Sequence, residues 1–268
     1  MSIEKHFGLN ELPYRLSPDP RFLYYSAEVR EAVEKCKYMT GNQIGPVYLY
    51  GSIGSGKTTL LKLLADVFKA DPAYRVAHLI SPNVRTSNAF LRMIMDEFDV
   101  KAQRAYAQSL RSFASFLLRG YGAGTPSLLL VDEAQNMTRD TLRLIHYLLN
   151  FETSRAKLLQ IVLAGQHRLA ERIMRFRELS SRMFPIALCG MAPDDLAAMV
   201  QYRWMVAGGK RAPFTPRAQR VIFTYTRGLP RDAVKLCGEC LRFMTARGRK
   251  TISPLQVESV AKGLNLRP

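Results

Sequence analysis

The chain has 268 residues, of which 47% are hydrophobic and 23% are charged. This balance is typical of a globular protein with a sizeable core, organised as one large domain or as a large and a small one. No apolar run approaches the roughly 18 residues of a membrane-spanning helix. The N-terminus carries Glu4 and Lys5 and has no apolar segment of the signal-peptide kind, so we expect a cytoplasmic protein without a membrane span.

The charge of the chain is strongly positive, with 39 Lys and Arg residues against 22 Asp and Glu residues and a net charge of +17. Residues 203–268 contain 14 basic and three acidic residues, so this segment holds most of the excess with a net charge of +11. A field of this sign attracts nucleic acid or an anionic membrane surface. A solvated basic surface without a partner is the alternative.

Cysteine usage excludes a disulfide framework, because Cys36, Cys189, Cys237 and Cys240 are too few and too scattered. Cys237 and Cys240 form one C-x-x-C pair, with no second pair and no histidine nearby. We expect two small buried residues on one helix face, with a zinc or redox role as the alternative.

The first half of the chain predicts alternating helices and strands. Residues 1–26 are rich in proline and aromatic residues, which predict an ordered arm without helix that lies on the core. Ser26 is expected to cap a helix that ends near Thr40. Strands are expected over residues 46–50 and 75–81, and helices over 59–68, 86–98 and 102–118.

Residues 51–58, with the sequence GSIGSGKT, fit the phosphate-binding loop G-x-x-x-x-G-K-[ST]. Glycines let the backbone wrap round a phosphate, while successive N–H groups and the start of the next helix face the anion. The Lys57 ammonium is expected to reach the β- and γ-phosphates and the Thr58 hydroxyl to ligand Mg²⁺. The expected nucleotide-binding residues are Gly51, Ser52, Gly54, Ser55, Gly56, Lys57, Thr58 and Thr59.

Residues 127–131 form an apolar run that predicts a buried parallel strand, and Asp132 and Glu133 follow it. Ligands bind at the carboxyl ends of such strands. We expect Asp132 to belong to the Mg²⁺ sphere and Glu133 to orient or deprotonate the attacking water. Residues 158–166 predict another buried strand, whose tip residue Gln166 is placed to contact the γ-phosphate or the water. A glutamine that only caps the loop is the alternative.

Residues 175–182 predict an arginine-dense helix end before a short strand over residues 183–188. An arginine is what a neighbouring subunit would supply to neutralise charge on the transferred phosphoryl group. Arg182 is the first choice, Arg175 and Arg177 are the other candidates, and a solvated helix face is the alternative. From about Met191 the pattern is helical, and Arg231 begins a helix over residues 232–245 that is expected to fold back over the nucleotide.

Together these features resemble an AAA+ ATPase, and several short motifs are similar to its ExeA-type branch. The resemblance covers nearly the whole chain. The motifs are FGL at 7–9, PDPRFLY at 18–24, DEAQN at 132–136, LNFET at 149–153, LAGQ at 163–166, PFT at 213–215, GLPR at 228–231 and TIS at 251–253.

The resemblance implies a P-loop α/β fold with a parallel-sheet core and a small C-terminal helical lid. The expected division is an arm over residues 1–26, a nucleotide-binding core over 27–190 and a basic lid over 191–268. It also implies ATP and Mg²⁺ as cofactors, a site between subunits of a homo-oligomer, and a γ-phosphate-sensing role for Arg231. Catalysis is then expected from Lys57, Asp132, Glu133, Gln166, Arg182 and Arg231.

Two kinds of protein share this module. Stand-alone transposition regulators of the TnsC, TniB and MuB type assemble with ATP on double-stranded DNA, as rings or helical filaments, and direct a transposase together with a target-selection protein. The basic lid and the lack of a membrane segment favour this kind, whose DNA contacts would fall on Arg85, Lys101 and Arg104. The alternative is an ExeA-like ATPase for secretion or envelope assembly that acts on a protein partner.

Overall fold

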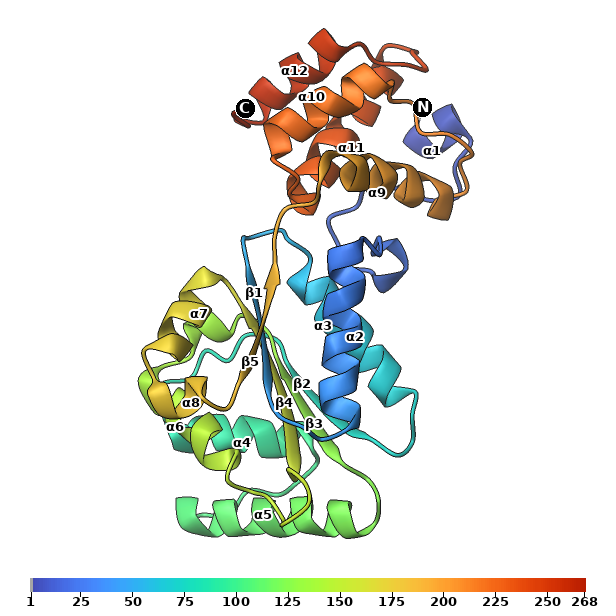
Figure 1. Cartoon of the computed structure of the whole chain (residues 1–268). Helices are drawn as coiled ribbons and strands as arrows, with labels where there is room; N and C mark the ends of the chain where they lie inside the picture. The colour runs from blue at the N-terminus through green and yellow to red at the C-terminus, as the bar shows by residue number, and fades with distance from the viewer. Residues whose placement is uncertain (1) are drawn as a thin grey trace. The chain divides into compact units, whose positions relative to one another are not determined.

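The computed structural model describes residues 2–268 and contains a five-stranded parallel sheet. The strands lie in the order β2-β3-β4-β1-β5, so β1 sits between β4 and β5. This is the parallel α/β arrangement expected from the sequence (Figure 1). The strands are β1 (Val47–Gly51), β2 (Arg75–Leu79), β3 (Ser127–Val131), β4 (Leu159–Gly165) and β5 (Phe184–Leu188).

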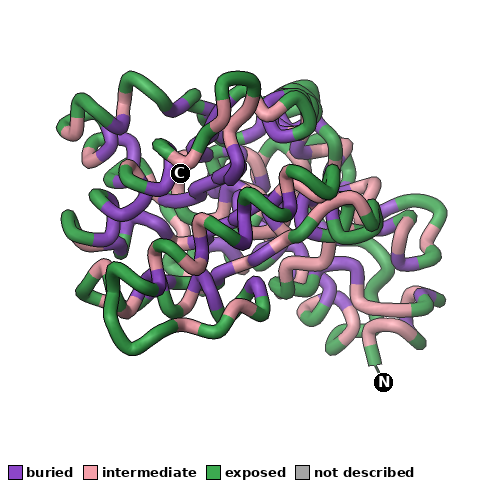
Figure 2. Tube along the Cα trace, turned by 90° about the horizontal axis from the view of Figure 1, so that it is seen from below, coloured by how far each residue is buried: buried purple, intermediate pink, exposed green. Residues whose placement is uncertain are grey.

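Helices cover the sheet because alternate strand residues point to opposite faces. One face packs into a large apolar cluster with residues of α4 (Ser87–Glu97), α5 (Tyr106–Gly122), α6 (Arg139–Leu148) and α7 (His167–Met174). Figure 1 shows α2 (Ala27–Gly41) and α3 (Lys57–Lys69) on the opposite side of the sheet from α7. Every residue of β3 and β4 is buried, and apart from Ser127 and Gln160 these central strands are apolar. Figure 2 marks the buried stretches of the chain in purple.

The chain forms two compact units, and neither is continuous in sequence. One unit combines Met1–Arg30, of which Met1 lies outside the described residues, with Ser52–Thr59 and Cys189–Pro268. The other combines Glu31–Gly51 with Leu60–Leu188 and contains the sheet. The division into an arm, a core and a lid stays a prediction.

The C-terminal helices build the core of the first unit. They are α9 (Pro193–Val206), α10 (Pro216–Thr226), α11 (Pro230–Ala246) and α12 (Pro254–Gly263). Cys237 and Cys240 are both buried on α11, where burial raises the pKa of Cys240 to about 12. Both therefore pack as small apolar residues. No helix within residues 2–268 is long and apolar enough to cross a membrane.

The N-terminal arm packs with these C-terminal helices, whereas the sequence led us to expect it on the sheet-containing core. Leu9, Tyr14 and Phe22 enter the same apolar cluster as Trp204. Arg203 of α9 holds the arm by donating to the carbonyl oxygens of Pro13 at 2.9 Å, Arg15 at 2.9 Å and Phe22 at 3.2 Å. The arm is thus an ordered part of the first unit.

The arm also contains helix, contrary to expectation. A short helix, α1 (Ile3–Phe7), precedes the first proline, with Ser2 as its cap and Gly8 at its end with φ of +70°. A 3₁₀ turn, η1 (Pro20–Phe22), begins with proline at the position where its missing N–H costs nothing. The prolines therefore exclude helix only between these two elements.

Three other expectations about helices were wrong in detail. Helix α5 begins at Tyr106 instead of residue 102, because Ser109 and Arg92 hold Gln103 in a turn. Helix α6, capped by Thr138, was not predicted. The arginine-dense segment is divided, since Arg175 ends α7 and a separate short helix, α8 (Arg177–Ser180), follows.

Candidate functional site

The phosphate-loop sequence forms a tight loop between β1 and α3. Gly54 has φ of +86° and Gly56 has φ of +101°, a conformation that residues with side chains resist. Lys57 is 7% exposed, and its ammonium donates to the Ser52 carbonyl at 2.8 Å and to the Ser55 hydroxyl at 3.3 Å. Because α3 also begins at Lys57, a buried cation and a helix N-terminus meet in a loop shaped for an anion.

Arg231 lies against this loop within the same compact unit. Its backbone N–H donates to the Gly54 carbonyl at 3.2 Å. A Cβ atom added to Gly54 would stand 2.6 Å from the Cβ of Arg231, so only glycine fits there. The turn that delivers Arg231 contains Gly228 with φ of +76°, whose carbonyl accepts from the Met191 N–H at 2.8 Å. The first unit therefore brings the phosphate loop and Arg231 together.

Asp132 and Glu133 follow the buried end of β3. Asp132 is 2% exposed, and one of its carboxylate oxygens accepts from the Glu133 N–H at 2.8 Å. The Asp132 N–H in turn donates to the Leu79 carbonyl of β2 at 2.9 Å. Glu133 has φ of +51° and ψ of +32°, a left-handed conformation that is uncommon outside glycine. Its carboxylate direction thus depends on an unusual backbone.

Gln166 follows the end of β4, the strand that pairs with β3. Its N–H donates to the side-chain oxygen of Gln135 at 3.1 Å, and the amide nitrogen of Gln135 donates to Glu133 at 2.5 Å. The second unit therefore brings Asp132, Glu133 and Gln166 together, with Gln135 between them. Sequence reasoning assigned no role to Gln135, although the DEAQN motif contains it.

The three arginines proposed for a neighbouring site have different surroundings. Arg182 is exposed, and its guanidinium donates to the side-chain oxygen of Asn150 at 2.5 Å. Arg177 is exposed at the start of α8. Asn150 belongs to the LNFET motif, so this motif gives Arg182 a defined direction at the surface.

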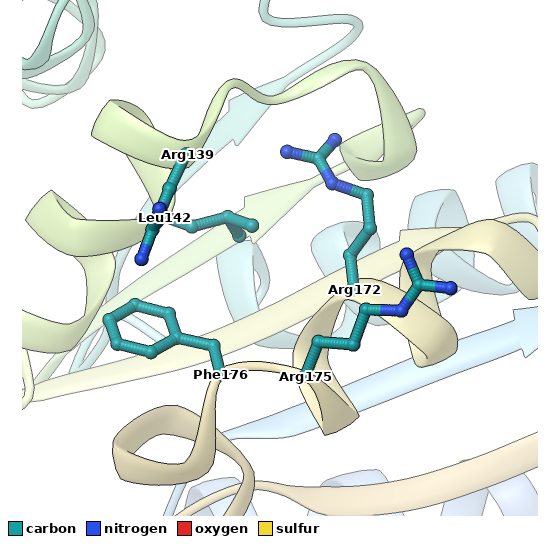
Figure 3. Close-up of a pocket in the computed structure, with 5 residues that line it drawn as sticks. All are labelled: Arg139, Leu142, Arg172, Arg175 and Phe176. Carbon is teal, nitrogen blue, oxygen red and sulfur yellow. The ribbon is translucent and has the colours of Figure 1, made fainter.

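Arg175 instead lines a pocket of about 240 Å³ (Figure 3). The other lining residues are Arg139, Leu142, Arg172 and Phe176. Arg172 also donates to the main-chain carbonyl of Gln135 at 2.7 Å, and burial lowers the pKa of Arg172. The pocket is therefore electropositive, with an apolar part, and one of its walls supports the turn that follows β3.

The three candidates for DNA contact lie in exposed loops of the sheet-containing unit. Arg85 precedes the cap of α4, and its carbonyl accepts from the Thr138 hydroxyl at 2.9 Å. Lys101 and Arg104 stand in the turn before α5 instead of in the helix expected for Arg104. None of the three guanidinium or ammonium groups is buried, so all remain available to an anionic partner.

Comparisons with known proteins agree with this geometry. Residues 42–173 match the model of an AAA domain. Over 251 residues the chain is 33% identical to general secretion pathway protein A of Aeromonas hydrophila, which covers 92% of this chain. The chain spans 45% of that relative's length. Residues 42–173 form an AAA domain, and the chain has the fold of a P-loop AAA+ ATPase.

Solved structures show the fold of this AAA+ ATPase. A Drosophila origin recognition complex bound to DNA is similar with a TM-score of 0.69 and 17% identity, covering 99% of this chain and 66% of that one. Cdc6p of Pyrobaculum aerophilum gives 0.67 at 17% identity, covering 97% and 70%. The RuvB branch-migration motor of Thermotoga maritima gives 0.61 at 17% identity, covering 90% and 70%. At these identities the likeness concerns the fold alone.

P-loop AAA domains use ATP and Mg²⁺, and the phosphate loop of this chain fits the pair. Its glycines, the buried Lys57 ammonium and the N-terminus of α3 supply donors for phosphate oxygens. Hard oxygen ligands suited to Mg²⁺ are present in the Thr58 hydroxyl and the buried Asp132 carboxylate.

Proposed function

We propose that this AAA+ ATPase acts on a protein partner in secretion or envelope assembly, as an ExeA-like enzyme. The observation that supports the proposal is the 33% identity to general secretion pathway protein A, which extends over 92% of the chain. Both candidate functions of this chain use ATP, so we also propose that the chain acts in the cytoplasm.

The proposed hydrolysis divides its tasks among four groups of residues. Lys57 binds the β- and γ-phosphates through its ammonium, and Glu133 orients the attacking water and accepts its proton. Thr58 and Asp132 would hold Mg²⁺, which would neutralise charge on the phosphates. Gln166, at the end of β4, contacts the γ-phosphate or the water.

The proposed site is completed by a neighbouring subunit in a ring or helical filament. Arg182 is the residue proposed to reach the neighbour's nucleotide, because Asn150 holds its guanidinium at the surface of the subunit. Arg231 lies against the phosphate loop and is proposed to sense the γ-phosphate. Loss of that phosphate would then change both the lid and the subunit interface.

The second candidate function is ATP-dependent regulation of transposition on double-stranded DNA, with a transposase and a target-selection protein as partners. The observation that favours it is the distribution of charge. Of the 14 basic residues in 203–268, every one except the half-buried Arg203 is exposed. Two of them, Arg242 and Lys262, pair with Glu239 at 2.7 Å and Glu258 at 2.8 Å. A basic surface of this kind attracts a polyanion.

DNA binding separates the two functions. Binding of duplex DNA is measured with a slowly hydrolysed ATP analogue, with ADP and without nucleotide, at about 50 mM and about 200 mM salt. The secretion function predicts ATP hydrolysis that duplex DNA leaves unchanged and no analogue-dependent binding. Binding that needs the analogue, weakens steeply with salt and yields rings or filaments would overturn it in favour of transposition.

Three variants test which residues any DNA binding depends on. Lys57→Ala removes the phosphate-binding ammonium and is expected to abolish any nucleotide-dependent signal. A triple variant, Arg85→Ala, Lys101→Ala and Arg104→Ala, removes the loop candidates for DNA contact. Its matched control is Arg247→Ala, Arg249→Ala and Lys250→Ala, which removes the same charge from exposed positions near the end of α11. If DNA binds, the pair of triple variants shows which surface carries it.

A further inference from the structure

Gln135 occupies a position between the ends of two paired strands. It lies in the 3₁₀ turn η2 (Ala134–Asn136) that follows β3, and it is 7% exposed. Its amide nitrogen donates to a carboxylate oxygen of Glu133 at 2.5 Å, and its amide oxygen accepts from the Gln166 N–H at 3.1 Å. Both polar atoms of the buried Gln135 amide therefore form hydrogen bonds with residues that follow β3 and β4.

The orientation of this amide follows from its partners. A backbone N–H can only donate, so the oxygen of Gln135 must face Gln166 and the NH₂ group must face the Glu133 carboxylate. Gly165 leaves the necessary space, because a Cβ atom there would stand 2.7 Å from the amide oxygen. Arg172 holds the main chain of the same residue by donating to its carbonyl at 2.7 Å. Gln135 is thus fixed through both its side chain and its backbone.

Glu133 depends on such support. Its left-handed backbone is costly for a residue with a side chain and persists only where neighbours impose it. The Asp132 carboxylate imposes part of it by accepting the Glu133 N–H. The amide of Gln135 restrains the other end of Glu133, namely one oxygen of the carboxylate.

We propose that Gln135 is a positioning residue for ATP hydrolysis, whose amide holds one oxygen of Glu133 and directs the other toward the attacking water. The inference rests on the proposed role of Glu133 in activating water. Because the same amide accepts from Gln166, the carboxylate is aligned with the tip of β4. Gln135 itself touches neither the nucleotide nor the water.

The test is steady-state ATP hydrolysis by the purified full chain with Gln135→Met, a variant of similar length that cannot make either hydrogen bond. We expect kcat to fall on the order of 10- to 100-fold, which is part of what a correctly placed general base contributes. The KM for ATP and the affinity for a fluorescent ATP analogue stay within about twofold, because the amide of Gln135 is bonded to Glu133 and Gln166 and not assigned to binding phosphate. A raised KM and a weaker affinity for the analogue, with kcat unchanged, would contradict the proposal.

The matched control is Gln160→Met. Gln160 is a buried glutamine of the same strand pair, 1% exposed, and its amide donates to the Lys157 carbonyl at 2.9 Å near the start of β4. Like Gln135→Met, the Gln160→Met variant loses a hydrogen bond of a buried amide. Gln160, however, lies near the start of β4, at the opposite end of the strand pair from Glu133. We expect the thermal stability of this variant to fall while kcat stays unchanged. An equal loss of kcat in both variants would show a merely structural role and overturn the proposal.

Gln135→Glu gives a second readout within one protein. Its carboxylate can still accept from Gln166, but it offers Glu133 no donor until a proton is shared between the two groups. We expect low activity at about pH 8 that rises toward about pH 6, a rise that the unmodified protein does not show. A pH profile parallel to that of the unmodified protein would overturn the proposal, even if Gln135→Met does not fold.

Glu133→Gln in the same assay keeps the two proposals apart. If Glu133→Gln retains hydrolysis, the role proposed for Glu133 is wrong. If Glu133→Gln abolishes hydrolysis while Gln135→Met remains fully active or becomes faster, only the positioning role of Gln135 is wrong.

Discussion

At the scale of single residues, glycines decide which groups can approach each other in this protein. Gly54 has a positive φ and no room for a side chain beside Arg231, whereas Gly248 has φ of +63° with no atom within 4 Å of an added Cβ. Backbone strain is therefore common to both positions, and of these two only Gly54 also has a steric conflict. This contrast allows the two effects to be measured separately.

We expect Gly54→Ala to weaken ATP binding about tenfold or more, since a strain of about 1–2 kcal/mol must be relieved by moving the loop or Arg231. The measurement is titration with a fluorescent ATP analogue. Gly248→Ala carries similar backbone strain and is expected to lower stability without changing nucleotide affinity. Equal affinities for Gly54→Ala and the unmodified protein would show that the loop tolerates the methyl group.

Local sequence predicts most of the candidate site, but not the partners that reach it from other strands. The phosphate loop, the Asp132–Glu133 pair and the position of Gln166 after a strand depend on neighbouring residues, and the structure has them at these places. The role of Gln135 depends on β4 lying beside β3, which only strand order determines. The sequence feature that could have indicated this role is the polar residue Gln135, two positions after Glu133.

At the scale of elements, tertiary contacts set the boundaries that periodicity misses. Residues before Tyr106 have a helix-compatible sequence, yet Ser109 holds Gln103 through both its backbone groups, accepting from the N–H at 2.9 Å and donating to the carbonyl at 3.2 Å. Helix α6 was missed although Thr138 caps it and its apolar face is buried. Strands and the phosphate-loop helix were easier to predict because apolar runs and motif spacing mark them directly.

We expect Ser109→Ala to destabilise the protein by about 1–3 kcal/mol, because both backbone groups of Gln103 lose a buried partner. The turn that carries Lys101 and Arg104 should loosen with it. The measurement is urea-induced unfolding, supported by hydrogen exchange of residues 99–105. Ser181→Ala, at an exposed helix end, is the control and should change stability little. Equal unfolding midpoints for the two variants would contradict this account.

At the scale of the whole molecule, the half-buried Arg203 joins the N-terminal arm to the C-terminal helices. Burial lowers the pKa of Arg203, and its guanidinium is compensated by three carbonyl oxygens of the arm and by the ring of Phe22 at 4.9 Å. The arm is thereby part of the first unit's core, although its bonded residues lie 181 to 190 residues before Arg203 in the sequence.

We expect Arg203→Met to lower the free energy of unfolding by about 3 kcal/mol, because three carbonyl oxygens lose a charged donor. The arm should then be cut by trypsin at Arg15 while the rest of the chain resists. Arg203→Lys should recover part of the stability, since an ammonium reaches fewer of the three oxygens. Lys210→Met removes an equal charge from an exposed position and is expected to leave both measurements unchanged.

The discontinuous first unit also constrains the order in which the molecule is completed during synthesis. Residues 52–59 emerge from the ribosome early, but the helices they pack with belong to residues 189–268, which are made much later. Domains generally fold as their residues become available, from the N-terminus onward. The sheet-containing unit can therefore form on the ribosome while the phosphate loop still lacks its neighbours, so the nascent chain acquires a complete nucleotide-binding loop only after residues 189–268 have been made.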